Sequence, residues 1–149
     1  MWCLQEAQEI TGISPDMYAE FIFPYHKRTA ELFGLTCYAC CEGADPYWGS
    51  VKQLHRLRRV SVSQWADLDK MAEYLDKDYV LSYKANPSDV AMPDMNEELI
   101  HTSIARALKK TRNNNVEIIL KDLHTISRRP EQVYRWVEIV REEIAKIYG

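Results

Sequence analysis

A short hydrophobic run typical of a β-strand recurs four times along the chain, and a segment with helical character follows each run. Two parallel strands cannot be joined by a tight turn, so a helix has to carry the chain back before the next strand pairs. The alternation therefore predicts an α/β fold built on a parallel sheet. The four runs are Leu35–Cys41, Arg59–Ser63, Tyr79–Tyr83 and Val116–Lys121.

Length and composition indicate one soluble domain over residues 1–149, with 46% hydrophobic and 28% charged residues. No apolar stretch reaches the roughly 18 residues of a membrane helix, and the start lacks a secretory signal, so we expect a cytoplasmic protein without a membrane partner. The net charge of −3 also argues against nucleic acid as a partner. Two of the four cysteines, Cys40 and Cys41, are adjacent, which favours reduced thiols over disulfides.

Helix boundaries can be predicted from a few polar residues and prolines. Ser14 is expected to cap a first helix that begins at Pro15, and Asp67 to cap the helix after the second strand. Asp94 and Glu97 have the spacing of a capping box, which opens a helix with Leu99 and Ile100 facing inward.

Polar and ionisable residues gather just past the carboxyl ends of the predicted strands. In parallel α/β folds these ends are where ligands and chemistry are found. The sequence therefore predicts a functional site at this rim of the sheet. The residues concerned are Cys40, Cys41, Glu42, Ser63, Gln64, Asp67, Lys84, Asn86, Lys121, Asp122 and His124.

Several segments resemble the uroporphyrinogen decarboxylase family, in order and over the whole chain. They are Ile13–Phe21 with Pro24–Lys27, Cys37–Glu42, Leu57–Asp67 and Lys121–Thr125. The resemblance is to an uncharacterised branch near the corrinoid and thiol methyltransferases. It implies that the chain is the C-terminal half of a TIM (β/α)8 barrel of the uroporphyrinogen decarboxylase type.

The family implies two chemistries. Its methyltransferases bind zinc and move methyl groups between corrinoid proteins and thiols. Its decarboxylases remove acetate carboxyls from uroporphyrinogen in haem synthesis without a cofactor. The decarboxylases also use an arginine-rich N-terminal motif and an aspartate that are absent from this chain, which puts decarboxylation by this chain alone in doubt.

The resemblance also suggests metal ligands. On the methyltransferase pattern Cys40 and His124 fall on ligand positions, while Tyr38 stands in place of the ligand histidine, so Cys41 or Glu42 would complete a zinc set. The alternative is that these cysteines are small buried hydrophobic residues.

Catalytic and binding residues are expected at the same rim. His124 is the candidate general acid or base, and Asp122 would orient its imidazole or cap the following turn. The candidates for substrate contact are Tyr38, Trp65, Lys84 and Asn86.

Three functions are open at this point. The first is zinc-dependent methyl transfer with a corrinoid protein as partner, and the second is cofactor-free decarboxylation of a tetrapyrrole. The third is a non-catalytic half-barrel that assembles as a homodimer or with a complementing half-barrel.

Overall fold

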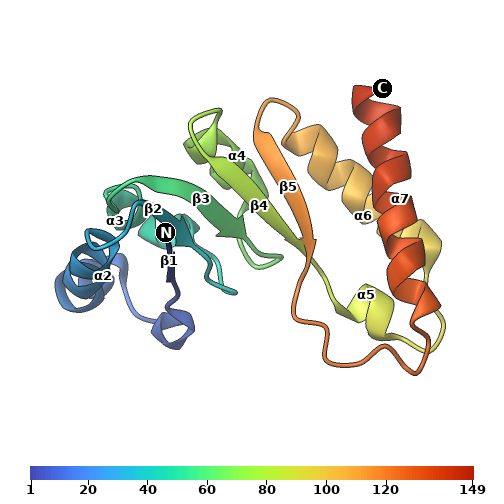
Figure 1. The fold of residues 1–149 in the computed structure, drawn as a ribbon, viewed down its shortest axis with the longest axis horizontal. Helices are drawn as coiled ribbons and strands as arrows, with labels where there is room; N and C mark the ends of the chain where they lie inside the picture. The colour runs from blue at the N-terminus through green and yellow to red at the C-terminus, as the bar shows by residue number, and fades with distance from the viewer.

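The computed structural model describes residues 1–149 and contains one five-stranded sheet whose neighbouring strands are all parallel. The strands follow one another in sequence order, and helices alternate with them (Figure 1). The predicted α/β class and parallel pairing are confirmed, and the arrangement is consistent with a half-barrel. The strands are β1 (Trp2–Gln5), β2 (Leu35–Tyr38), β3 (Leu57–Val62), β4 (Val80–Ala85) and β5 (Asn115–Leu120).

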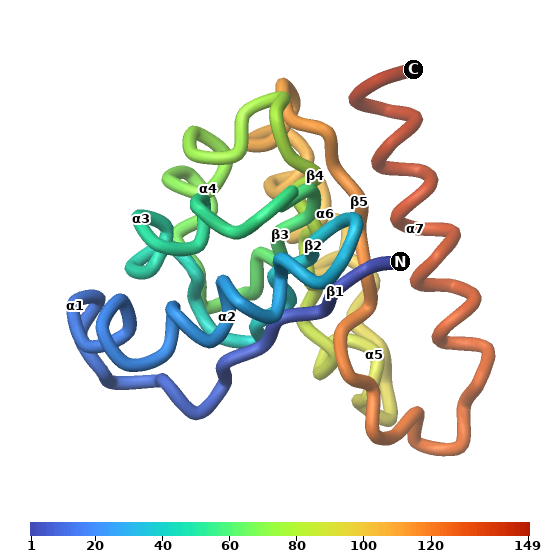
Figure 2. Tube along the Cα trace, turned by 60° about the vertical axis from the view of Figure 1, so that its left-hand side comes forward, coloured from blue at the N-terminus to red at the C-terminus, as the bar shows by residue number.

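The connections range from single turns to long helices, and the longest two, α6 and α7, run side by side next to β5 (Figures 1 and 2). A π-helical turn over Tyr18–Ile22 precedes Pro24, and it separates the short α1 from α2. The helices are α1 (Pro15–Met17), α2 (Phe23–Ala30), α3 (Trp48–Val51), α4 (Leu68–Leu75), α5 (Ser88–Ala91), α6 (Glu97–Lys110) and α7 (Glu131–Tyr148).

The strands depart from the sequence prediction in two places. The predicted count of four is wrong, because Trp2–Gln5 forms β1 and pairs with β2. Its exposed and buried residues alternate with the period of two that strands have, but the run is only four residues long. In addition, β2 ends at Tyr38 rather than Cys41, so both Cys40 and Cys41 lie in the loop beyond it.

Two of the predicted helix caps are confirmed. The Ser14 hydroxyl accepts a hydrogen bond from the Met17 amide, and the Asp67 carboxylate accepts one from Lys70. The capping box at Asp94 is wrong, because Asn96 caps α6 instead. Asp94 pairs with Arg129 in the loop before α7.

Both hydrophobic clusters of the protein pack on the same face of the sheet. Val60, Val62 and Leu81 belong to a cluster with α3 and α4, and Ala85 belongs to a second cluster with α6 and α7. Alternation along the strands turns the intervening residues to the opposite face. We call this opposite side the polar face, although the apolar Leu4, Val80 and Ile119 lie on it as well. Its other residues include Cys37, Arg59, Ser61, Ser82, Lys84 and Glu117.

An arginine holds the strands together across the polar face. Arg59 on β3 forms an ion pair with Glu117 on β5, and it also donates to the Ser82 hydroxyl at 3.1 Å and the Cys37 sulfur at 3.3 Å. The small side chains of Ser61 and Ser82 leave room for this long side chain to lie flat on the sheet. Arg59 thus connects β2, β4 and β5 to β3.

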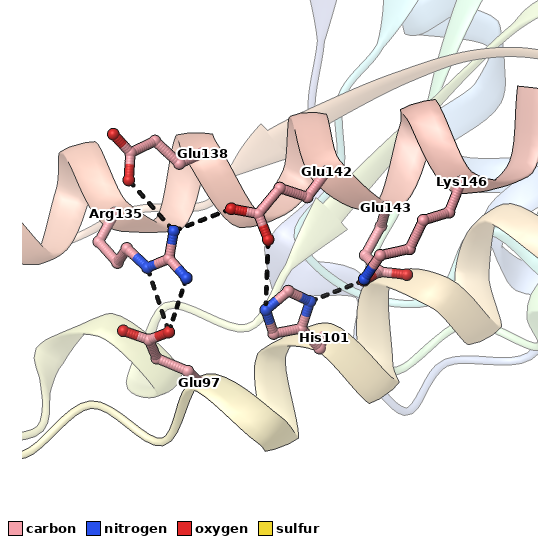
Figure 3. Close-up of polar contacts among 7 residues, drawn as sticks. All are labelled: Glu97, His101, Arg135, Glu138, Glu142, Glu143 and Lys146. Carbon is pink, nitrogen blue, oxygen red and sulfur yellow. Dashed lines mark hydrogen bonds and ion pairs between the residues drawn. The ribbon is translucent and has the colours of Figure 1, made fainter. Parts of the chain in front are cut away.

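A network of charged side chains joins α6 to α7 (Figure 3). Arg135 on α7 pairs with Glu97 on α6 at 2.8 Å, and His101 on α6 lies 2.7 Å from the buried Glu143 on α7. Lys146 and then His101 lower the pKa of Glu143 against the opposing effect of burial. The network fixes how the two helices pack, and none of its residues contacts the residues predicted for the rim.

Two neighbouring residues of α6 provide a test of the packing. Ile100 is 1% exposed whereas Leu99, which was also expected to face inward, is 52% exposed. We expect Ile100→Ala to lower the free energy of unfolding by about 2–5 kcal/mol, because it leaves a cavity. Leu99→Ala should change it by less than about 1 kcal/mol. Urea denaturation of both variants measures this difference, and equal losses would contradict the placement of α6.

Candidate functional site

Four side chains meet where the carboxyl ends of β2, β4 and β5 come together; we call them the rim cluster. They are Cys41, Lys84, Lys121 and Asp122. The Cys41 thiol donates a hydrogen bond to Asp122 Oδ2 at 3.3 Å, and Lys84 Nζ lies 3.8 Å from the Cys41 sulfur. Lys121 Nζ donates to the Cys41 carbonyl at 3.3 Å.

The curvature of the sheet creates this cluster. Strands β2 and β5 are separated by β3 and β4, yet Cys41 and Asp122 touch because the loops after both strands bend toward each other. Lys84 leaves the polar face of β4 and reaches over β3 to donate to the Ala39 carbonyl, just beyond β2. The rim cluster therefore draws on loops and strands that lie far apart in the sequence.

Both lysines of the rim cluster lack a carboxylate partner. None of the ion pairs in the protein includes Lys84 or Lys121, and their hydrogen bonds go to backbone carbonyls and to the Cys41 sulfur. Asp122 brings one negative charge, and it accepts its hydrogen bond from the thiol. The cluster thus keeps an excess of positive charge that an anion can neutralise.

The Cys41 thiol is held in its protonated form. Burial raises its pKa, and so does the hydrogen bond to Asp122, while Lys84 and Lys121 act in the opposite direction. Nucleophilic attack by this sulfur therefore requires Asp122 to take the thiol proton, and the thiolate that forms lies beside Lys84 and Lys121.

Cys40 and Tyr38, two of the residues predicted for the site, are in the core. Both belong to the hydrophobic cluster on the helix-covered face, and Tyr38 packs edge-on against His26. Cys40 is buried, which is the position that the alternative interpretation of the cysteines predicts. Its neighbour Cys41 is the sulfur that reaches the rim.

The residues predicted to bind zinc do not form one ligand set. His124 is exposed and makes no hydrogen bond or ion pair with another side chain, whereas Cys40 is buried. Nowhere do three or more His, Cys, Asp or Glu side chains gather as a metal site would require. Asp122 is bonded to Cys41 and does not orient His124. The donor positions in this structure do not fit zinc.

Asn86 has a structural role in the loop after β4. Its side-chain oxygen accepts a hydrogen bond from the Ser88 amide at 3.1 Å, and its amide donates to Asp89 at 3.4 Å. These contacts shape the start of α5 and leave Asn86 outside the rim cluster.

Trp65 and Glu42 line a shallow pocket of about 260 Å³ that opens beyond β1, β2 and β3. Gly43 fits closely here, because an added Cβ would lie 3.2 Å from the Trp65 carbonyl oxygen, which is tighter than most such contacts. Trp65 is 65% exposed, so it can stack on a ligand held at this rim. Trp65 thus lines a pocket, and its predicted contact with a substrate stays a prediction.

A larger groove of about 630 Å³ lies beside α7, at the other end of the sheet. Seven of its ten lining residues are hydrophobic, and it includes the start of β5 with Asn115 and Val116. It holds no nucleophile or cluster of charges, so we place the candidate site at the rim cluster.

Lys121 is the residue that the sequence analysis did not single out for binding. Its position beyond a strand was visible, but its partner, the Cys41 carbonyl, lies in a loop 80 residues away in the sequence. No sequence pattern connects the two.

Comparison with protein-family models and with curated proteins finds no match to this chain. Separately, the helices are all too short or too polar to cross a membrane.

Replacing the acceptor of the thiol proton provides a test of the rim cluster. In Asp122→Asn the Cys41 pKa should fall, because the carboxylate that stabilises the protonated thiol is gone while both lysines remain. The rate of Cys41 alkylation by iodoacetamide, followed by mass spectrometry against pH, should therefore reach its midpoint at lower pH. Asp94→Asn is the control, since Asp94 pairs with Arg129 and not with Cys41. If the alkylation rate of Asp122→Asn depends on pH as that of the wild type does, the contact between Cys41 and Asp122 is contradicted.

Proposed function

We propose that the chain is part of an enzyme of the uroporphyrinogen decarboxylase type, and that its rim cluster binds a small molecule with carboxylate groups. The observation that carries this proposal is the convergence of Lys84 and Lys121, neither of which has a carboxylate partner. Each ammonium group has three donors and uses only part of them on protein acceptors. Charge-assisted hydrogen bonds to a ligand carboxylate would use the rest.

Decarboxylation of a tetrapyrrole is the reaction that suits this site best. Uroporphyrinogen carries carboxylates around its ring, and the resemblance implies a branch that removes them without a cofactor. Trp65, exposed at the neighbouring pocket, would pack against a pyrrole ring of such a ligand. An eight-stranded TIM barrel around the site would need strands in addition to the five present here.

Methyl or alkyl transfer is the second candidate, and the Cys41 thiol is the observation that favours it. Cys40 and His124 do not supply a zinc site together, so transfer at this rim would depend on the chain's own sulfur at Cys41. A corrinoid protein would then be the partner that the resemblance implies.

Assembly is the third candidate, and the open edges of the sheet favour it. Strands β1 and β5 each pair on one side only, and Trp2 and Leu4 on β1 are more than half exposed. Parallel sheets are normally covered on both faces, which suits a homodimer or a complementing half-barrel. Light scattering during gel filtration would reveal either assembly.

The carboxylate site can be tested with uroporphyrin III, the oxidised and fluorescent form of the tetrapyrrole. We expect the protein to quench its fluorescence on binding, and Lys84→Ala and Lys121→Ala each to raise Kd about tenfold. Loss of one charge-assisted hydrogen bond, about 1.4 kcal/mol, corresponds to that factor. Lys109→Ala on α6 is the matched control and should bind as the wild type does.

Two results would change the assignment. If both lysine variants bind uroporphyrin as tightly as the wild type, the rim cluster is not the carboxylate site. If the purified protein carries stoichiometric zinc that is lost in Cys41→Ala, zinc-dependent methyl transfer replaces decarboxylation as the first candidate.

A further inference from the structure

We infer that Cys41 is a nucleophile that takes an alkyl group from an electrophile bearing a carboxylate. This inference rests on the carboxylate site proposed above and adds a covalent step to it. It assigns to the rim cluster a reactive atom, the Cys41 sulfur, and a chemical class of substrate.

Cys41 is the accessible thiol of the protein. Cys3, Cys37 and Cys40 are at most 3% exposed, whereas Cys41 is only partly buried. Cys37 is further occupied by the hydrogen bond from Arg59. An electrophile that arrives from solvent therefore meets one sulfur.

The charges around Cys41 suit both the thiolate and a carboxylate. Lys84 Nζ is 3.8 Å from the sulfur, and Lys121 Nζ is bonded to the carbonyl of the same residue. An electrophile held by its carboxylate between these two ammonium groups has its reactive carbon within a few bonds of the sulfur. Holding the two reactants together removes most of the entropic cost of their encounter.

A buried hydroxyl without a partner lies on the polar face, on the strand next to that of Lys84. Ser61 is fully buried, and its side-chain oxygen has no hydrogen-bond partner. It pairs in register with Ser82, and Lys84 follows two residues later on the same face. Buried hydroxyls are rarely left unpaired, so the free hydroxyl of Ser61 is an unusual feature of the polar face.

The covalent step balances without a further reactant. The Cys41 sulfur forms a bond to the alkyl carbon while the bond from that carbon to its leaving group breaks, and the leaving group departs with the electron pair. The thiol proton passes to Asp122 Oδ2, which already accepts its hydrogen bond, and then to solvent. The product is a thioether whose carboxylate remains beside the two lysines.

Iodoacetate and iodoacetamide test this inference directly, because they deliver similar alkyl groups and differ in the carboxylate. For each thiol we divide the rate of alkylation by iodoacetate by the rate of alkylation by iodoacetamide. A positively charged site attracts iodoacetate, so we expect this ratio to be at least about tenfold higher for Cys41 than for free glutathione. The site of alkylation is read by peptide mass spectrometry. Added salt should reduce the excess.

Variants separate the contributions of charge and folding. Lys84→Ala and Lys121→Ala should each bring the ratio closer to that of glutathione, while Lys84→Arg should retain it and Lys109→Ala should leave it unchanged. A wild-type ratio equal to that of glutathione would overturn the inference, as would equal excesses in wild type and both alanine variants. If the protein binds uroporphyrin but Cys41 shows no preference for iodoacetate, only this inference is refuted. If Cys41 prefers iodoacetate but the protein does not bind uroporphyrin, only the tetrapyrrole proposal is refuted.

Discussion

Parallel pairing of five strands in sequence order is the constraint on which the other features of this structure depend. Each parallel neighbour requires a crossover, and crossovers of one hand place the helices on one face of the sheet. Both hydrophobic clusters accordingly lie on that face, with Val60, Val62, Leu81 and Ala85. The opposite face has no helix partner among these clusters, and polar side chains such as Arg59, Ser82 and Glu117 bond to one another on it. Curvature of the same sheet brings the loops after β2 and β5 into contact, and the rim cluster results.

Much of the fold follows from local patterns, and the differences have local causes. The hydrophobic runs correctly predicted that four strands exist. Ser14 and Asp67 cap helices as expected, because a cap depends only on a side-chain oxygen and the free backbone amides a few residues later. The first strand was missed because its four residues depend on pairing with β2 for their structure. Asp94 failed as a cap because its partner Arg129 comes from a distant loop, and Asn96 was closer to the first helical turn.

The site was less predictable than the fold because it depends on where one strand ends. With β2 ending at Tyr38, the next residues turn so that Cys40 enters the core and Cys41 faces the rim. The sequence alone could not choose between adjacent identical residues, although it placed both, together with Lys84 and Asp122, at the correct edge. The contact of Cys41 with Asp122 spans 81 residues and arises from the curvature of the sheet. His124 was predicted from a resemblance and has no partner in the structure.

A comparison of charges on the polar face argues that the rim cluster is functional. Arg59 and Lys84 both lie on this face, and both reach across a neighbouring strand. Arg59 is neutralised by Glu117, as expected of a charge that holds strands together. Lys84 and Lys121 have only carbonyl and thiol partners, so the single carboxylate of Asp122 offsets the repulsion between them only in part. Uncompensated charges next to a nucleophile are a feature of binding and catalytic sites, where the ligand supplies the missing charge. Burial and then Asp122 raise the pKa of the Cys41 thiol against the effect of the two ammonium groups, so the neutral thiol leaves the place of the negative charge to the ligand.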